Sequence, residues 1–155
     1  MALTFAAATF DDRDMHHIME INNRAMTNLF CNPIEAEVLF DSLGEVRDFL
    51  RGTITVIVEF DETPITYFRY YFVETNTMRL CHLGPLAILP EYNTPDVNRM
   101  ISSFITHVAK NNVCRYVLVE SIESTMKSFI DDGYVIYARY TSGHLPVVRL
   151  KKIIS

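Results

Sequence analysis

Hydrophobic and polar positions along the chain follow two periods, one typical of β-strands and one typical of helices. Apolar and polar residues alternate over residues 53–60, and an aromatic segment at 65–74 follows the turn at 61–64, which predicts a hairpin. Apolar residues recur at helical spacing over residues 94–110. The same reasoning predicts strands at 3–9, 53–60, 65–74, 78–89, 115–120, 135–140 and 145–153, and helices at 11–24, 42–51, 94–110 and 121–132. Residues 25–40 have no clear period.

Composition and charge narrow the class of protein. The chain has 155 residues, of which 49% are hydrophobic and 21% charged, and this suits a single globular domain over residues 1–155. The formal net charge of −5 argues against binding to a nucleic-acid backbone. No membrane span or signal peptide is evident, and the three scattered cysteines suit free thiols in a reducing compartment. We therefore expect a cytoplasmic protein without nucleic-acid or membrane partners.

The most informative stretch, residues 84–101, reads as a strand, a tight turn and the start of a helix. Residues 86–89 form a short apolar run, as in a strand covered on both faces. Thr94, Pro95 and Asp96 then form a helix start, with a threonine N-cap, a proline at the first helical position and an acid in the first turn. This strand, turn and helix start is the part of the chain that points most directly to a known family.

The stretch resembles the central motif of the GCN5-related N-acetyltransferase (GNAT) superfamily, in which a strand ends in V-x-P-E-Y and runs into R/Q-x-x-G-x-G/A. Residues 89–92 take the place of the strand end, Asn93 that of the Arg/Gln, and Asp96 and Asn98 those of the two small residues. Residues 119–134 also resemble a later motif of the family. The resemblance implies an α/β (α+β) GNAT-like fold, a mixed, mostly antiparallel twisted sheet of about seven strands with about four helices.

In the family, pantetheine pairs with the open edge of the strand, and the acetyl-CoA pyrophosphate binds the backbone amides at the helix start. The equivalent positions are Leu86, Ala87, Ile88, Asn93, Thr94, Asp96 and Asn98. Here, however, Asp96 places a carboxylate beside the phosphate position, Pro95 lacks an amide donor and Thr94 can cap the helix itself. In a partly dry site the like-charge repulsion costs on the order of a few kcal/mol. We therefore expect these positions to have lost acetyl-CoA binding, with no cofactor.

The catalytic side of the resemblance is also incomplete. The family often uses a tyrosine to protonate the departing thiolate, and Phe129 occupies that position here. In the same helix we expect Phe129 and Ile130 to face inward. Glu120, at a strand end, and His82 remain as possible general bases. Each also has a structural interpretation, Glu120 as a solvated acid and His82 as a core or edge histidine. Because no partner ligand lies at a suitable spacing, we expect no metal.

Two functions of different classes follow, and a third stays open. The first is a GNAT-fold protein without acetyl-CoA binding that acts through a protein partner or a homo-oligomer. It could be a subunit, an inhibitor, or a phage or virion accessory protein, since some phage proteins resemble the family without its loop. The second is an active acyl-CoA N-acetyltransferase that acts on an amine, with Glu120 or His82 as the base. The third is a module that binds another small ligand.

Overall fold

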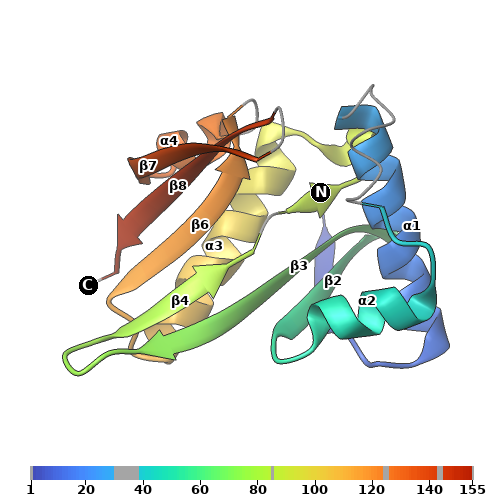
Figure 1. The fold of residues 1–155 in the computed structure, drawn as a ribbon, viewed down its shortest axis with the longest axis horizontal. Helices are drawn as coiled ribbons and strands as arrows, with labels where there is room; N and C mark the ends of the chain where they lie inside the picture. The colour runs from blue at the N-terminus through green and yellow to red at the C-terminus, as the bar shows by residue number, and fades with distance from the viewer. Residues whose placement is uncertain (1, 30–38, 85, 124–125, 143–144, 155) are drawn as a thin grey trace. The chain divides into compact units, whose positions relative to one another are not determined.

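A computed structural model describes residues 2–29, 39–84, 86–123, 126–142 and 145–154 (Figure 1). Its strands and helices are β1 (Leu3–Ala7), α1 (Asp12–Leu29), α2 (Leu43–Leu50), β2 (Ile54–Phe60), β3 (Thr63–Glu74), β4 (Arg79–Leu83), β5 (Ala87–Ile88), the 3₁₀ turn η2 (Pro90–Tyr92), α3 (Pro95–Asn111), β6 (Tyr116–Ile122), α4 (Lys127–Asp131), β7 (Val135–Ser142) and β8 (Leu145–Ile153). The strands hydrogen-bond in the order β1-β2-β3-β4-β6-β8-β7, and β5 pairs with β3. Among the described strand pairs, β4–β6 is parallel, whereas β1–β2, β3–β4, β3–β5, β6–β8 and β7–β8 are antiparallel. The predicted fold class is therefore confirmed.

The chain forms two compact units, and β3 continues from one into the other. The first unit comprises Met1–Arg69 and Leu86–Asn93, as far as these are described, and the second comprises Tyr70–Pro85 and Thr94–Ser155. Each unit is described by itself below. That residues 1–155 form one domain stays a prediction.

The first unit holds α1 and α2 against β1, β2, β5 and the first half of β3. The apolar residues of α1 recur every three or four positions, so they form one stripe that is buried in the core. That core consists of Met15, Ile18, Ile21, Ala25, Val46, Leu50, Ile57, Tyr67, Ala87 and Leu89. Ser42 caps α2 by accepting a hydrogen bond from the Glu45 amide. Asp61 and Glu62 have positive φ, as the tight turn between β2 and β3 requires.

In the second unit, α3 connects the parallel strands β4 and β6, and β8 and β7 extend the sheet antiparallel (Figure 1). α3 buries Val97, Ile101, Ile105 and Ala109. The strands contribute the buried residues Cys81, Leu83, Val117, Val119, Val148 and Leu150. α3 and α4 thus provide the apolar layer for this part of the sheet.

Most predicted elements are confirmed, with shifted ends, and two need correction. The strand predicted at 78–89 is divided, because β4 ends at Leu83 and β5 begins at Ala87. The helix predicted at 121–132 begins only at Lys127, because Ser121 and Ile122 continue β6 beside β8. Ile130, expected to face inward, is 39% exposed. α1 extends to Leu29, beyond the predicted end at residue 24. Among the described helices, none is long and apolar enough to cross a membrane.

Candidate cofactor and catalytic positions

The start of α3 caps itself, as the sequence predicts. Thr94 has an extended backbone (φ −117°, ψ 158°), and its Oγ1 accepts a hydrogen bond from the Val97 amide at 3.3 Å. The Thr94 carbonyl accepts another from the Asn98 amide at 3.1 Å. Pro95 follows at the first helical position, where it has no amide N–H to donate. The Val97 amide, which a bound anion could use, is therefore already hydrogen-bonded within the chain, whereas the Asn98 bond is the first of the ordinary helical hydrogen bonds.

Asp96 lies in a more favourable environment than its sequence position suggests. Its carboxylate forms an ion pair with the Arg99 guanidinium at 3.2 Å, and the two side chains are 72% and 67% exposed. Two like charges 4 Å apart repel by only about 1 kcal/mol in water, against several kcal/mol in a partly dry site. The Arg99 charge reduces this repulsion further. The electrostatic argument for lost acetyl-CoA binding is thus much weaker than the sequence indicated.

The strand before α3 has one unpaired edge within the first unit. β5 pairs with β3 through Thr66 opposite Ile88 and Tyr67 opposite Ala87. The Thr66 hydroxyl donates to the Ala87 carbonyl at 2.7 Å. Within the described part of this unit, no strand pairs with the other edge of β5. Ala87 and Ile88 are buried and Leu86 is half-buried, so this short strand is fixed from the β3 side.

The turn between β5 and α3 is held by contacts that the sequence did not reveal. The Asn93 amide donates to the Pro90 carbonyl at 3.3 Å, which closes η2. The Glu91 carboxylate accepts a hydrogen bond from the Arg24 guanidinium at 2.8 Å. The pKa of Glu91 lies below its ordinary value because of its own backbone amide and, secondly, Arg24. Arg24 ties the family-like Pro-Glu-Tyr segment to α1.

Glu120 is the centre of a polar cluster on the sheet of the second unit. Its Oε2 accepts a hydrogen bond from the Tyr140 hydroxyl at 2.9 Å, and its Oε1 accepts one from Arg149 Nε at 3.2 Å. The Glu120 side chain is 24% exposed. Burial and the bond to Glu120 raise the pKa of Tyr140, so the hydroxyl keeps its proton at neutral pH. The cross-strand register, Glu120 opposite Arg149, could have revealed one of these partners.

His82 lies on β4 and stacks on a neighbouring aromatic ring. The imidazole and the Tyr71 ring have centroids 4.8 Å apart and are inclined by 19°. The register sets His82 beside Leu118 on β6, two residues before Glu120, so His82 and Glu120 point to the same face of the sheet. Both candidate bases are thus on one surface of the second unit.

Phe129, at the family's tyrosine position, is buried and packs edge-on against Tyr134, with ring centroids 5.3 Å apart. Burial raises the pKa of the Tyr134 phenol. Among the described residues, no cluster of three histidine, cysteine or acidic side chains could hold a metal ion.

Comparison of the chain with known proteins identifies its fold. No family model matches the chain, and no curated protein matches it. Solved structures match over nearly its whole length. A GCN5-related N-acetyltransferase from Rhodopseudomonas palustris shares 16% identity and covers 99% of this chain and 98% of its own, at a TM-score of 0.77. A GNAT-family acetyltransferase from Streptococcus pneumoniae gives 14% identity, 99% and 100% coverage and a TM-score of 0.75.

The chain has the GNAT fold. A further GNAT-fold match is a chain of the NatC complex, solved with Gag peptide and CoA, at 13% identity, 100% coverage of both chains and a TM-score of 0.72. The resemblance drawn from residues 84–101 and 119–134 is thereby confirmed at the level of the fold. Identities this low show the fold and not the activity.

Proposed function

We propose that the chain is an acyl-CoA-dependent N-acyltransferase that acts on an amine through an atypical cofactor loop. The observation that carries the proposal is the match to the GNAT fold along the whole chain, which includes a structure solved with CoA. The exposure of Asp96 and its ion pair with Arg99 reduce the main electrostatic objection to about 1 kcal/mol. This is the second of the two functions that the sequence left open.

Predicted cofactor positions in each of the two units suit a part of an acyl-CoA. Within the described part of the first unit, one edge of β5 is unpaired, and the backbone at Leu86–Ile88 would accept pantetheine amides there, in the way that an extended ligand joins a sheet edge. The start of α3 offers a helix N-terminus, which favours phosphate. The Thr94 cap bond of 3.3 Å is long, so a phosphate oxygen can replace the threonine hydroxyl at the Val97 amide. When bound, the cofactor supplies the acyl group as an activated thioester.

The second unit contains two side chains that could act as the general base and accept the proton of an amine. Glu120 and His82 share one face of the sheet, and Glu120 is held by Tyr140 and Arg149. Both oxygens of Glu120 are engaged, so it would accept a proton only after one of these bonds opens. His82, which stacks on Tyr71, is the other candidate to take the proton, directly or through water. The roles of both residues stay predictions.

Binding of acetyl-CoA is the first test. We expect calorimetry to detect saturable binding in the sub-millimolar range and transfer to a primary amine to release free thiol. A ligand at one hundred times its dissociation constant stabilises the folded state by about 2.7 kcal/mol, which a thermal melt detects. Dephospho-CoA and pantetheine are matched controls, because they separate phosphate contacts from strand-edge contacts. Absence of a thermal shift with 10 mM acetyl-CoA would rule out the proposal for this donor.

A second candidate is a cofactor-free GNAT-fold protein that acts through protein contacts. Two observations favour it. The Val97 amide at the start of α3 is already used by the Thr94 hydroxyl, and Phe129 has no proton to give where the family often has a tyrosine. For this candidate we expect no shift with acetyl-CoA and a stable complex with a partner in a pull-down. Acetyl-CoA binding with turnover would exclude it.

A further inference from the structure

An open hollow of about 580 Å³ lies in the second unit, at the C-terminal end of α3. We call it the α3-end groove, and it is lined by Lys110, Val113, Cys114, Arg115, Ile153 and Ile154. α3 has 17 residues, so at 1.5 Å per residue its two ends are about 25 Å apart. The groove is therefore separate from the cofactor position at the start of α3.

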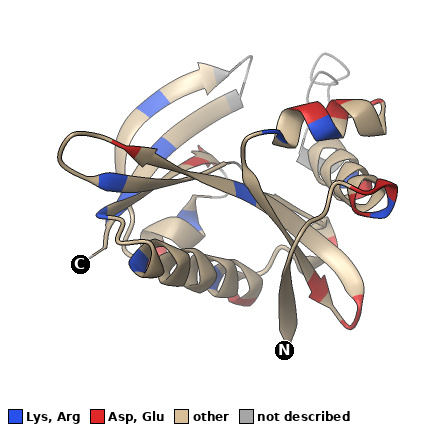
Figure 2. Ribbon diagram, turned by 90° about the horizontal axis from the view of Figure 1, so that it is seen from below, with Lys and Arg blue, Asp and Glu red and all other residues tan. Residues whose placement is uncertain are grey.

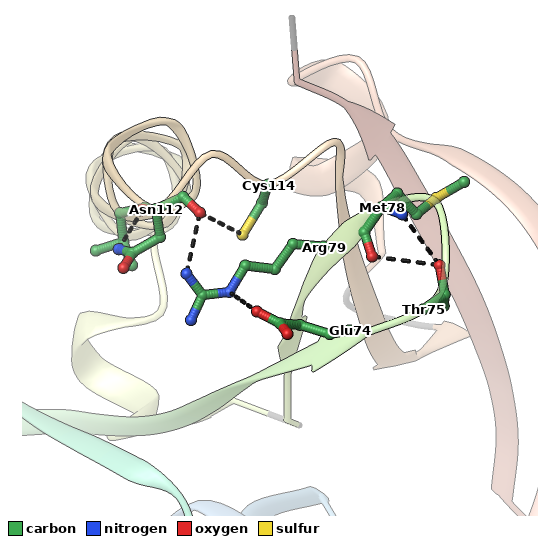
Figure 3. A network of polar contacts seen from close by, with 7 residues as sticks. Glu74, Thr75, Met78, Arg79, Asn112 and Cys114 are labelled. Carbon is green, nitrogen blue, oxygen red and sulfur yellow. Dashed lines mark hydrogen bonds and ion pairs between the residues drawn. The ribbon is translucent and has the colours of Figure 1, made fainter.

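Backbone hydrogen bonds fix the walls of the groove. The Cys114 amide donates to the Ala109 carbonyl at 2.9 Å, and the Ile154 amide donates to the Arg115 carbonyl at 2.7 Å. Behind these walls, Figure 3 shows the Arg79 guanidinium between Glu74 and the Asn112 carbonyl, to which it donates at 3.2 Å. The groove is thus formed by the end of α3, the connection from α3 to β6, and the end of β8. The backbone hydrogen bonds of Cys114 and Ile154 hold these segments in place.

The groove exposes apolar side chains at a strained point of the backbone. Val113 is 85% exposed and Ile153 is 67% exposed. Val113 also has a φ of 57°, a left-handed conformation that a β-branched residue rarely adopts. Asn or Gly would adopt this conformation with less strain.

The rim of the groove is positively charged although the chain as a whole is acidic. Two of the six lining residues, Lys110 and Arg115, are cations, and Lys151 lies on β8 two residues before the lining residue Ile153. Within the described residues, these three side chains form no ion pair with a carboxylate, whereas the neighbouring Lys152 is paired with Asp132 at 3.0 Å. Figure 2 shows blue Lys and Arg segments at this end of α3 and on the strands beside it. Lys151 Nζ also lies 5.9 Å from the centres of the two tyrosine rings at 116 and 137. These cations are available to an incoming anion.

We propose that the α3-end groove binds a segment of a partner protein in which apolar side chains are flanked by carboxylates. The apolar side chains would cover Val113 and Ile153, and the carboxylates would pair with Lys110, Arg115 and Lys151. Charge complementarity identifies this occupant, because the unpaired cations surround an apolar floor in a protein of net charge −5. Nucleic acid fits less well, because a chain of net charge −5 repels a phosphate backbone. The proposal holds whether or not acyl-CoA binds.

A peptide titration tests the proposal. The probe is a short fluorescein-labelled peptide with two leucines flanked by aspartates and glutamates, and binding to the full chain is followed by anisotropy. We expect saturable binding to the wild type. Arg115→Glu and Ile153→Asp should each weaken binding by about tenfold, and not by more, because each side chain would contact the peptide at an exposed surface. Arg13→Glu makes the same charge change on α1 and is the matched control. Thermal melts establish that each variant is folded.

Several results would overturn the proposal. A peptide with lysines in place of the acids should not bind, and equal binding would show that charge does not select the occupant. A peptide with serines in place of the leucines should bind at least tenfold more weakly. Competition by hexanoate as strong as that of the unlabelled peptide would mean that the groove takes a free carboxylate instead of a protein segment. Absence of saturable binding up to millimolar peptide would refute the proposal outright.

Discussion

Replacing Asp96 by asparagine tests how strongly the Asp96 carboxylate at the start of α3 repels a phosphate. Asp96→Asn removes a negative charge, keeps the size of the side chain and leaves the Thr94 cap in place. Because Asp96 is 72% exposed, its repulsion of a phosphate charge at about 4 Å amounts to about 1 kcal/mol. The variant should therefore bind acetyl-CoA about fivefold more tightly than the wild type.

Arg99 provides the opposite change at the same position. The Arg99 guanidinium pairs with Asp96 at 3.2 Å, so Arg99→Gln removes the compensating charge and should weaken acetyl-CoA binding by about fivefold. The double variant should bind like the wild type, because the two effects cancel. Calorimetry at low salt measures all three affinities. In 1 M salt the screening length falls to about 3 Å, and the differences should nearly vanish.

Three outcomes would refute this reasoning. A gain of a hundredfold in Asp96→Asn would mean a repulsion of several kcal/mol, and hence the partly dry site that the sequence suggested. Equal affinities for all variants would mean that the phosphates bind elsewhere. A higher melting temperature for the free Asp96→Asn protein would also count against it, because an acid in the first turn stabilises a helix by about 0.3–1 kcal/mol.

Three further predictions concern stability. Burial raises the pKa of the Cys81 thiol to about 12. The unfolded thiol loses its proton near pH 9 while the folded one keeps it, so this thiol should lower the stability measured by urea unfolding by about 1.4 kcal/mol per pH unit from pH 9 towards 12. The slope in Cys81→Ala should be shallower by this amount but not zero, because burial also raises the pKa values of Cys114, Tyr67 and Tyr134. Tyr67→Phe removes a buried hydrogen bond of 2.9 Å to Asn22 and should lower the free energy of unfolding by about 1–2 kcal/mol. Two glycine substitutions should have opposite effects on the free energy of unfolding. Gly44→Ala, in α2, makes only ordinary contacts and should raise it by about 0.5–1 kcal/mol, whereas Gly133→Ala, at φ 94°, should lower it by about 1 kcal/mol. Urea unfolding of both variants compares them.

The sequence predicts those features of the fold that depend on local patterns. The start of α3 is confirmed residue by residue, because capping by Thr94 and the place of Pro95 follow from neighbours in the chain. The division of the long strand into β4 and β5 was missed, since its residues are apolar on both sides of the break. The late start of α4 was missed because pairing with β8 keeps Ser121 extended, and such pairing is a tertiary effect.

The candidate site was predicted as a set of positions, but its environment was not. Asp96 lies in the first turn of α3 as predicted, yet its exposure depends on packing that no local pattern reports. The Arg149 partner of Glu120 follows only from a register between distant strands, and the Tyr140 partner depends on a strand beyond that. The same limit applies to the α3-end groove, because Arg115 and Ile153 are far apart in the chain and meet only at the ends of β6 and β8.

The structure also sets the affinity expected for acetyl-CoA. Displacing the Thr94 cap costs about 1 kcal/mol, the Asp96 charge about 1 kcal/mol, and the missing amide of Pro95 about 1 kcal/mol. The sum, about 3 kcal/mol, weakens binding by about 150-fold relative to a glycine loop. If such a loop corresponds to a dissociation constant of a few micromolar, this chain should bind in the range of about 0.1–1 mM. Binding tighter than about 10 μM would show that at least one of these three free-energy costs is absent. Binding weaker than about 10 mM would leave the α3 start without a cofactor role, because such affinity cannot compete with ordinary ligands in the cell.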